Sequence, residues 1–265
     1  MTDSPIAEGL FTDAEAYAKY RLRHSSAFYK CLVRKFSLTK ESTVVDLGCG
    51  PGMVALDIAS YVDRVIAVDI EQAALDKGKS LAQERGVQNV EWFKCRSEDI
   101  LSINRRADLT VMADSFHWME CKKVLDDLFL MTNDGGGIVI SGLLGTVKPD
   151  FCDDLFKTVP VVDTPKAEVA NKAVAKGMLS RDLDFVKKSS FTDYEIINLE
   201  RTVPSTKEDI FGLYYYTTGK FQQHREKCPE KFRAWLTEYL DAQTDFTLRG
   251  FETAILAYKR SLKRE

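Results

Sequence analysis

The sequence predicts an α/β protein built on a doubly wound, mostly parallel sheet of seven strands. Short β-branched segments alternate with helical patterns from residue 43 to residue 144, which is typical of a parallel sheet with helices on both faces. A glycine-rich turn follows the first of these strands. Two late strand patterns, at 195–203 and 246–258, extend the same sheet. We therefore expect one domain over residues 1–265 and not two.

The remaining elements follow from hydrophobic periodicity. One helix is expected at 13–36, because Tyr17, Tyr20, His24, Phe28 and Cys31 recur at steps of three or four residues. Strands are expected at 43–47, 64–69, 90–95, 107–113 and 137–144, with helices at 51–60, 71–85 and 121–131 and a turn at 133–136. Short inserted helices are expected within 150–190, and two helices, at 207–221 and 230–240, lie between the late strands.

Composition narrows the range of partners. The 40 acidic and 37 basic residues leave a formal charge of −3, which argues against nucleic acid as the main partner. The six cysteines contain no Cys-x-x-Cys pair, as is usual for idle thiols in a reducing compartment. No leader peptide is visible, and no apolar run approaches the about 20 residues that cross a bilayer. We expect a cytoplasmic protein without membrane contact, and the sequence leaves monomer and homodimer open.

The most specific motif is the run Val44-Val45-Asp46-Leu47-Gly48-Cys49-Gly50-Pro51-Gly52, in which a strand passes through a glycine turn into a helix. Glycines let the backbone approach a ligand closely. Asp46 lies where a carboxylate can meet an ammonium group, and its negative charge disfavours a pyrophosphate. Asp69 ends the next strand, where an acid can accept both hydroxyls of a ribose. The alternative for Asp69 is a helix N-cap.

With these motifs, residues 42–142 resemble the class I methyltransferases that use S-adenosylmethionine (SAM), which implies their Rossmann-like fold. The whole chain resembles the small-molecule subgroup similar to trans-aconitate methyltransferase. The segment 11–21, the stretch Ser115-Phe116-His117-Trp118 and the closing segment 225–260 carry this finer resemblance. It implies a helical cap at 1–41, a SAM-binding core at 42–144, a substrate-side insertion at 145–225 and a closing helix and strand at 226–265. Leu22 stands where the subgroup usually has proline.

The resemblance implies a set of cofactor-binding residues. We expect these to be Tyr20, Arg21, Asp46, Gly48, Cys49, Gly50, Asp69, Ile70, Arg96, Ser97, Glu98, Ala113 and Ser115. Arg96 replaces the usual small or acidic residue. Two alternatives are open for its side chain, stacking on the adenine and exposure to solvent. Tyr17, Tyr20 and Arg21 are expected to fold over the bound SAM, where Arg21 is able to hold a carboxylate.

His117 is the candidate catalytic residue, because it follows the fourth strand at the rim of the sheet and histidine titrates near neutral pH. Its alternative role is pocket lining. Expected substrate-binding residues are Tyr17, His117, Trp118, Tyr214 and Tyr215. Asp114 suggests a magnesium ligand, but residues 141–144 supply no second acid, so no metal is expected.

We therefore expect a SAM-dependent enzyme that methylates oxygen, as carboxylate or hydroxyl, on a small molecule. Three alternatives remain open: N- or C-methylation of a natural product, a SAM-binding partner protein without turnover, and a nicotinamide-dependent reductase.

Overall fold

The computed structural model describes residues 14–142, 146–159, 176–191, 193–218 and 221–260. Their centre is one sheet with five parallel strands in the order β3-β2-β1-β4-β5, followed by the antiparallel β8. On its other side β8 pairs with β7, also antiparallel. The bounds are β1 Thr43–Leu47, β2 Arg64–Asp69, β3 Val90–Lys94, β4 Ala107–Ala113, β5 Thr132–Gly142, β6 Val147–Lys148, β7 Asp193–Val203 and β8 Leu248–Tyr258.

The predicted fold class is confirmed, with one strand more than expected. This strand is the two-residue β6, which pairs with β8 beyond the end of β5. Two helical layers cover the parallel strands. Helices α2 (Ser26–Lys35), α3 (Met53–Ile58) and α4 (Gln72–Glu84) pack on one face, and α5 (Cys121–Met131) and α8 (Lys176–Lys187) pack on the other. Segments of 3-10 helix occur at Ala59–Tyr61, Ser97–Ile103 and Phe116–Trp118.

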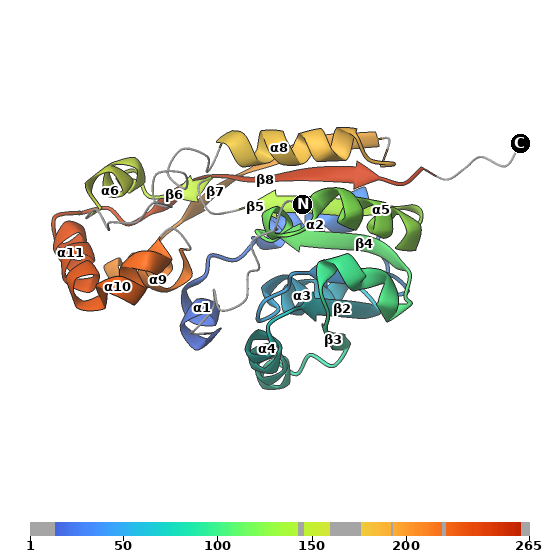
Figure 1. Ribbon diagram of the computed structural model, residues 1–265, viewed down its shortest axis with the longest axis horizontal. Helices are drawn as coiled ribbons and strands as arrows, with labels where there is room; N and C mark the ends of the chain where they lie inside the picture. Colours follow the sequence, from blue (N-terminus) through green and yellow to red (C-terminus); the bar gives the residue numbers. More distant parts are fainter. Residues whose placement is uncertain (1–13, 143–145, 160–175, 192, 219–220, 261–265) are drawn as a thin grey trace, which may run out of the picture.

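A further group of helices gathers at one end of the long strands β7 and β8 (Figure 1). We call these the outer helices: α6 (Cys152–Thr158), α9 (Lys207–Thr217), α10 (Gln222–Lys227) and α11 (Pro229–Asp241). They share a core rich in aromatic side chains, with Phe221 and Phe232 fully buried at its centre. Helix α1 (Ala14–Tyr20) contacts both α9 and α4, so it links the outer helices to the sheet.

The single helix predicted at 13–36 is wrong: the chain forms α1 and α2, separated by residues 21–25. The interruption comes from Ser25, whose backbone N–H and hydroxyl both donate to the buried Glu252 carboxylate of β8, at 2.8 and 2.7 Å. The Ser25 hydroxyl in turn caps α2 by accepting the N–H of Phe28 at 3.2 Å. A long-range contact has overridden a continuous helical pattern.

The turn predicted at 133–136 is also wrong, because β5 begins at Thr132. Gly135 and Gly136 exchange backbone hydrogen bonds with Lys259, at 2.9 and 2.8 Å. The pairing of β5 with β4 changes register across them, from Ala107–Thr132 to Leu109–Gly137, so the glycines form an irregularity within the strand. Residues 143–144 of the predicted strand lie outside the described residues, as does 160–175 of the expected insertion. In the described part of the chain no helix is both long and apolar enough to cross a membrane.

Candidate functional site

The glycine turn joins β1 to α3 at the carboxyl edge of the sheet. Gly48 has a φ of 73°, and both its N–H and that of Cys49 donate to the carbonyl of Val68, at 2.8 and 3.0 Å. A Cβ at Gly48 would lie 2.6 Å from the Cβ of Ser115. Glycine is therefore required here for two reasons, a left-handed backbone and close contact with the segment after β4.

A tryptophan that was not predicted as a site residue packs against the end of this turn. The Trp92 ring of β3 lies between Gly52 and Gly78, and a Cβ at either glycine would lie 2.4 Å from it. Two glycines far apart in sequence thus make room for one large ring. No local pattern reveals this, because the three residues meet only in the folded sheet.

Asp46 is almost completely buried, with 1% of its surface exposed. Its Oδ2 accepts the N–H of Ala55 at 2.9 Å. Burial raises the pKa of this carboxyl to about 7, against the opposing effect of that hydrogen bond. A cationic ligand group beside Asp46 would favour the ionised form.

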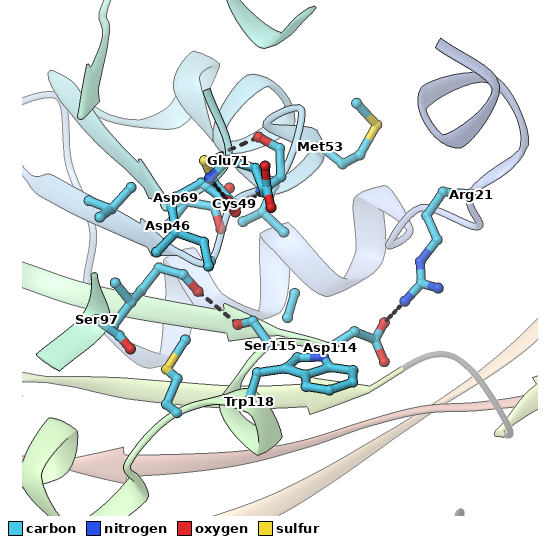
Figure 2. A pocket seen from close by; sticks show the side chains of 18 of the residues that line it. Arg21, Asp46, Cys49, Met53, Asp69, Glu71, Ser97, Asp114, Ser115 and Trp118 are labelled. Atoms are coloured by element: carbon cyan, nitrogen blue, oxygen red, sulfur yellow. Dashed lines mark hydrogen bonds and ion pairs between the residues drawn. The ribbon is translucent and has the colours of Figure 1, made fainter. Parts of the chain in front are cut away.

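Asp69 lies beside the glycine turn, close to Cys49 (Figure 2). Its Oδ2 accepts the N–H of Gly50 at 2.7 Å, and its Oδ1 accepts the N–H of Glu71 at 2.9 Å. Burial raises the pKa of Asp69, and the two backbone donors oppose this rise. Each carboxylate oxygen has a second lone pair, so both remain able to accept a ligand hydroxyl.

One cavity contains most of the predicted site residues. Those that line it are Tyr17, Arg21, Asp46, Gly48, Cys49, Gly50, Asp69, Ile70, Arg96, Ser97, Glu98, Ala113, Ser115 and Trp118. Ser115 is held by its hydroxyl, which donates to the carbonyl of Leu47 at 2.7 Å. Arg96 is half-exposed and lies 3.6 Å from Glu98. The individual roles assigned to these residues stay predictions.

Four predicted residues do not line this cavity: Tyr20, His117, Tyr214 and Tyr215. Tyr20 faces α9, where its ring covers Gly212 and stacks on Tyr216 with centroids 5.6 Å apart. Tyr214 and Tyr215 pack among the aromatic side chains of the outer helices.

His117 lies beside Trp118, with ring centroids 4.9 Å apart. Burial lowers the pKa of His117 to about 4, so its imidazole is uncharged at neutral pH. The lining of this cavity does not include the four residues, and their predicted roles stay predictions.

Other lining residues were not assigned to the site from sequence. His24 is buried, and its Nε2 lies 3.1 Å from the Ser141 hydroxyl. Burial lowers the pKa of His24 to about 3. Arg23 and Tyr29 also line the cavity. They reach it because the helical structure is interrupted between α1 and α2. A continuous helix would have carried His24, Phe28 and Cys31 on one packed stripe.

The largest addition is an ion pair inside the cavity. Arg21 Nη2 lies 2.6 Å from Asp114 Oδ2, with 8% and 18% of the two side chains exposed (Figure 2). The Arg21 guanidinium lies 5.4 Å from the centre of the Tyr17 ring. From its sequence context, Asp114 suggested only a magnesium ligand. Among the described residues no group of three or more His, Cys, Asp or Glu side chains is arranged to hold a metal.

Comparison with known families identifies the kind of domain that contains the glycine turn. Residues 44–136 match a family model described as a methyltransferase domain. This segment is a class I, SAM-dependent methyltransferase domain. Its cofactor fits the observed turn for two reasons. A Cβ at Gly50 would meet no protein atom within 4 Å, so this side of the turn is open to a ligand, and the buried Asp46 is suited to an ammonium group.

Relatives of the methyltransferase domain share about a quarter of their residues with it. Ribosomal protein L11 methyltransferase of Campylobacter concisus is 26% identical over 153 residues, which cover 54% of this chain and 50% of that protein. The uncharacterized methyltransferase YcgJ of Bacillus subtilis is 23% identical over 129 residues, which cover 48% and 51%. The chain therefore spans about half the length of these curated relatives.

Solved structures show the same fold over more of the chain. The crystal structure of the Bacillus subtilis YcgJ protein matches with a TM-score of 0.55 and 16% identity. The match covers 89% of this chain and 100% of that one. The methyltransferase fold thus extends beyond residues 44–136.

Proposed function

We propose that the chain is an enzyme that transfers a methyl group from SAM to an oxygen atom of a small molecule. The observation that carries this proposal is the extent of the cavity. It continues from the glycine turn to Tyr17, Arg21 and Asp114, so one cavity offers both a cofactor end and an acceptor end. Arg21, with 8% of its side chain exposed, covers the acceptor end.

The cofactor end has a residue for each part of SAM. In this proposal Asp46 holds the ammonium group, Asp69 accepts the ribose hydroxyls, and the backbone of Gly48 to Gly50 lies against the methionine portion. Ser97 and Glu98 lie at the adenine side. SAM supplies a methyl group on a sulfonium, which is an activated carbon electrophile. The chain's own contribution is to align the acceptor with that carbon and to exclude water.

A small acceptor is favoured over a nucleic acid by charge. The chain has 40 acidic and 37 basic residues, so it has no cationic excess for a phosphate backbone. Its relatives include enzymes named for a ribosomal protein and for tRNA 5-carboxymethoxyuridine. These two substrate classes are therefore the alternatives that an experiment must include. The closer likeness to trans-aconitate methyltransferase belongs to the same proposal.

The test is methyl transfer from isotope-labelled SAM to four matched pools: carboxylic acids, phenols and alcohols, bulk tRNA, and purified ribosomal proteins. We expect label in a small-molecule pool only, with the product identified by mass spectrometry as an ether or an ester. Label in tRNA or protein alone would contradict the small-molecule proposal. Label on nitrogen or carbon would contradict oxygen as the acceptor atom.

A further inference from the structure

Asp114 is held in an unusual backbone conformation directly after β4. Its φ is 54°, a left-handed value that is uncommon for a residue with a side chain and that costs free energy. Its N–H donates to the carbonyl of Ser141 at 2.8 Å, which ties it to the end of β5. The neighbouring Gly142 has no side chain, and a Cβ there would lie 3.3 Å from Asp114 Oδ1. Both strand ends thus accommodate one orientation of this carboxylate.

Arg21 holds the same carboxylate from the opposite wall. The guanidinium reaches Asp114 Oδ2 at 2.6 Å from the residue that follows α1. Its Nη1 lies 3.5 Å from the carbonyl of Thr217, at the end of α9. Two largely buried charges at this distance form a directional, charge-assisted pair. Asp114 therefore has a fixed position in the cavity wall.

His117, the residue favoured by sequence, is less suited to accept a proton from a ligand. It does not line the cavity, whereas Asp114 does. A general base must lie within hydrogen-bond reach of the proton that it removes. Geometry therefore favours Asp114.

We propose that Asp114 is the proton acceptor for a neutral hydroxyl compound, with Arg21 as its positioning residue. This inference rests on the proposed function and deepens it. In the reaction an oxygen–carbon bond forms at the acceptor, and the carbon–sulfur bond breaks with its electron pair left on sulfur. The hydroxyl proton passes to Asp114, which later releases it to solvent.

The charges around the cavity favour a neutral hydroxyl compound over a carboxylate or a cationic amine. Its lining has five acidic side chains, Asp46, Asp69, Glu71, Glu98 and Asp114, against the three arginines Arg21, Arg23 and Arg96. A carboxylate acceptor would add a further negative charge to a guanidinium that Asp114 already neutralises. A cationic amine would meet the same guanidinium directly. A neutral hydroxyl avoids both repulsions and can donate its hydrogen bond to Asp114.

The first measurement does not depend on turnover. The protein is saturated with S-adenosylhomocysteine, the demethylated product, and 4-nitrophenol is bound as a probe whose phenolate absorbs visible light. In the wild type Asp114 should keep the bound probe neutral at a pH where the free probe ionises. In Asp114→Asn the freed Arg21 should shift the bound probe to the phenolate. Equal spectra in the two proteins, or failure of the probe to bind, would overturn the proposal.

The second measurement compares methyl transfer to phenol and to benzoate. We expect transfer to phenol, and a loss in kcat of about 100-fold in Asp114→Asn, the size typical of general base catalysis, with SAM affinity within threefold. Arg21→Lys should retain more activity than Arg21→Ala. The matched control is Asp126→Asn, which removes an exposed ion pair with Lys122 on α5 and should leave the activity unchanged.

Two results separate the proposals. Transfer to benzoate alone, or full activity in Asp114→Asn, would overturn the role of Asp114 and leave the proposed function intact. No transfer to any acceptor by the wild type would contradict the proposed function, while the spectra of bound 4-nitrophenol would still report on Asp114.

Discussion

Asp46 shows how one residue couples burial to ligand binding. None of the described basic side chains forms an ion pair with this buried carboxylate, and its pKa is raised to about 7. The raised pKa means that the folded, unliganded protein binds a proton at Asp46 more tightly than the unfolded chain does. The stability from that proton is full below the ordinary pKa of 3.8 and is lost as the pH rises through about 7.

The same titration predicts a pH dependence for cofactor affinity. An ammonium group needs the ionised carboxylate, so affinity for SAM should rise about tenfold between pH 6 and pH 8. Asp46→Asn can keep the hydrogen bond to Ala55 but cannot ionise, so this part of the dependence should vanish and affinity should fall. Calorimetric titration of both proteins across this range measures the difference. Parallel pH profiles for wild type and variant would argue against contact between Asp46 and the ammonium group.

Gly48 offers a second residue-scale test with an internal control. Gly48 and Gly86 have similar φ values, 73° and 67°, but only a Cβ at Gly48 meets a neighbour. Both alanine substitutions should cost about 1–2 kcal/mol for the left-handed backbone. Gly48→Ala should cost about 1–3 kcal/mol more for overpacking against Ser115, and should weaken SAM binding. Urea denaturation compares the two, and equal losses would show that the contact with Ser115 is unimportant.

At the scale of elements, α1 is positioned by one close contact. Its salt bridges, Glu15 to Lys77 and Lys19 to Glu208, each include at least one well-exposed side chain and contribute little. The Tyr20 ring, by contrast, lies so close to Gly212 that a Cβ there would be 2.1 Å away. The absence of a side chain at residue 212 thus lets α1 dock on α9.

This contact predicts a reversal of sign in a double-mutant cycle. Gly212→Ala should destabilise the wild type by about 1–3 kcal/mol, because the new methyl group meets the Tyr20 ring. In a Tyr20→Ala background the same change should stabilise by up to about 1 kcal/mol, since alanine favours a helix over glycine. Free energies of unfolding for the four proteins measure the coupling. Additive effects would show that the two residues do not meet.

The elements that the sequence predicts well are those with local signals. The strands at 43–47, 64–69 and 107–113 have the predicted bounds, because β-branched runs and flanking turns mark them. The gap between α1 and α2 has no such signal. The stripe from Tyr17 to Cys31 continues through it, and long-range contacts such as that of Ser25 with Glu252 interrupt the helix. Similarly, the glycines of the predicted turn lie within β5, because Gly135 and Gly136 form backbone hydrogen bonds with Lys259.

The same division holds within the site. Asp46, Gly48, Gly50 and Asp69 are recognisable because one strand, one turn and the next strand end carry them in a fixed order. The Arg21–Asp114 pair joins residues 93 positions apart, from different elements, and no spacing in the sequence predicts it. His117 has the residue type expected of a base, but whether a side chain faces the cavity is decided by packing that the sequence does not display.

At the scale of the whole molecule, α1 lies between the methyltransferase domain and the outer helices. The methyltransferase domain supplies the glycine turn, and the outer helices, with a core of their own, supply α9, on which α1 docks. Arg21 then carries the end of α1 to the strand ends at Asp114. The proposed cofactor site therefore lies at a sheet edge that local sequence signals predict. The proposed acceptor site also needs α1, whose position depends on tertiary contacts.

The most direct test of the central claim is calorimetric titration of the purified protein with SAM, S-adenosylhomocysteine and NADH. We predict micromolar binding of both sulfur ligands at one site per chain and no binding of NADH. Asp46→Ala should abolish this binding. Binding of NADH in place of the sulfur ligands, or no binding of SAM, would contradict the assignment of the glycine turn as a SAM site.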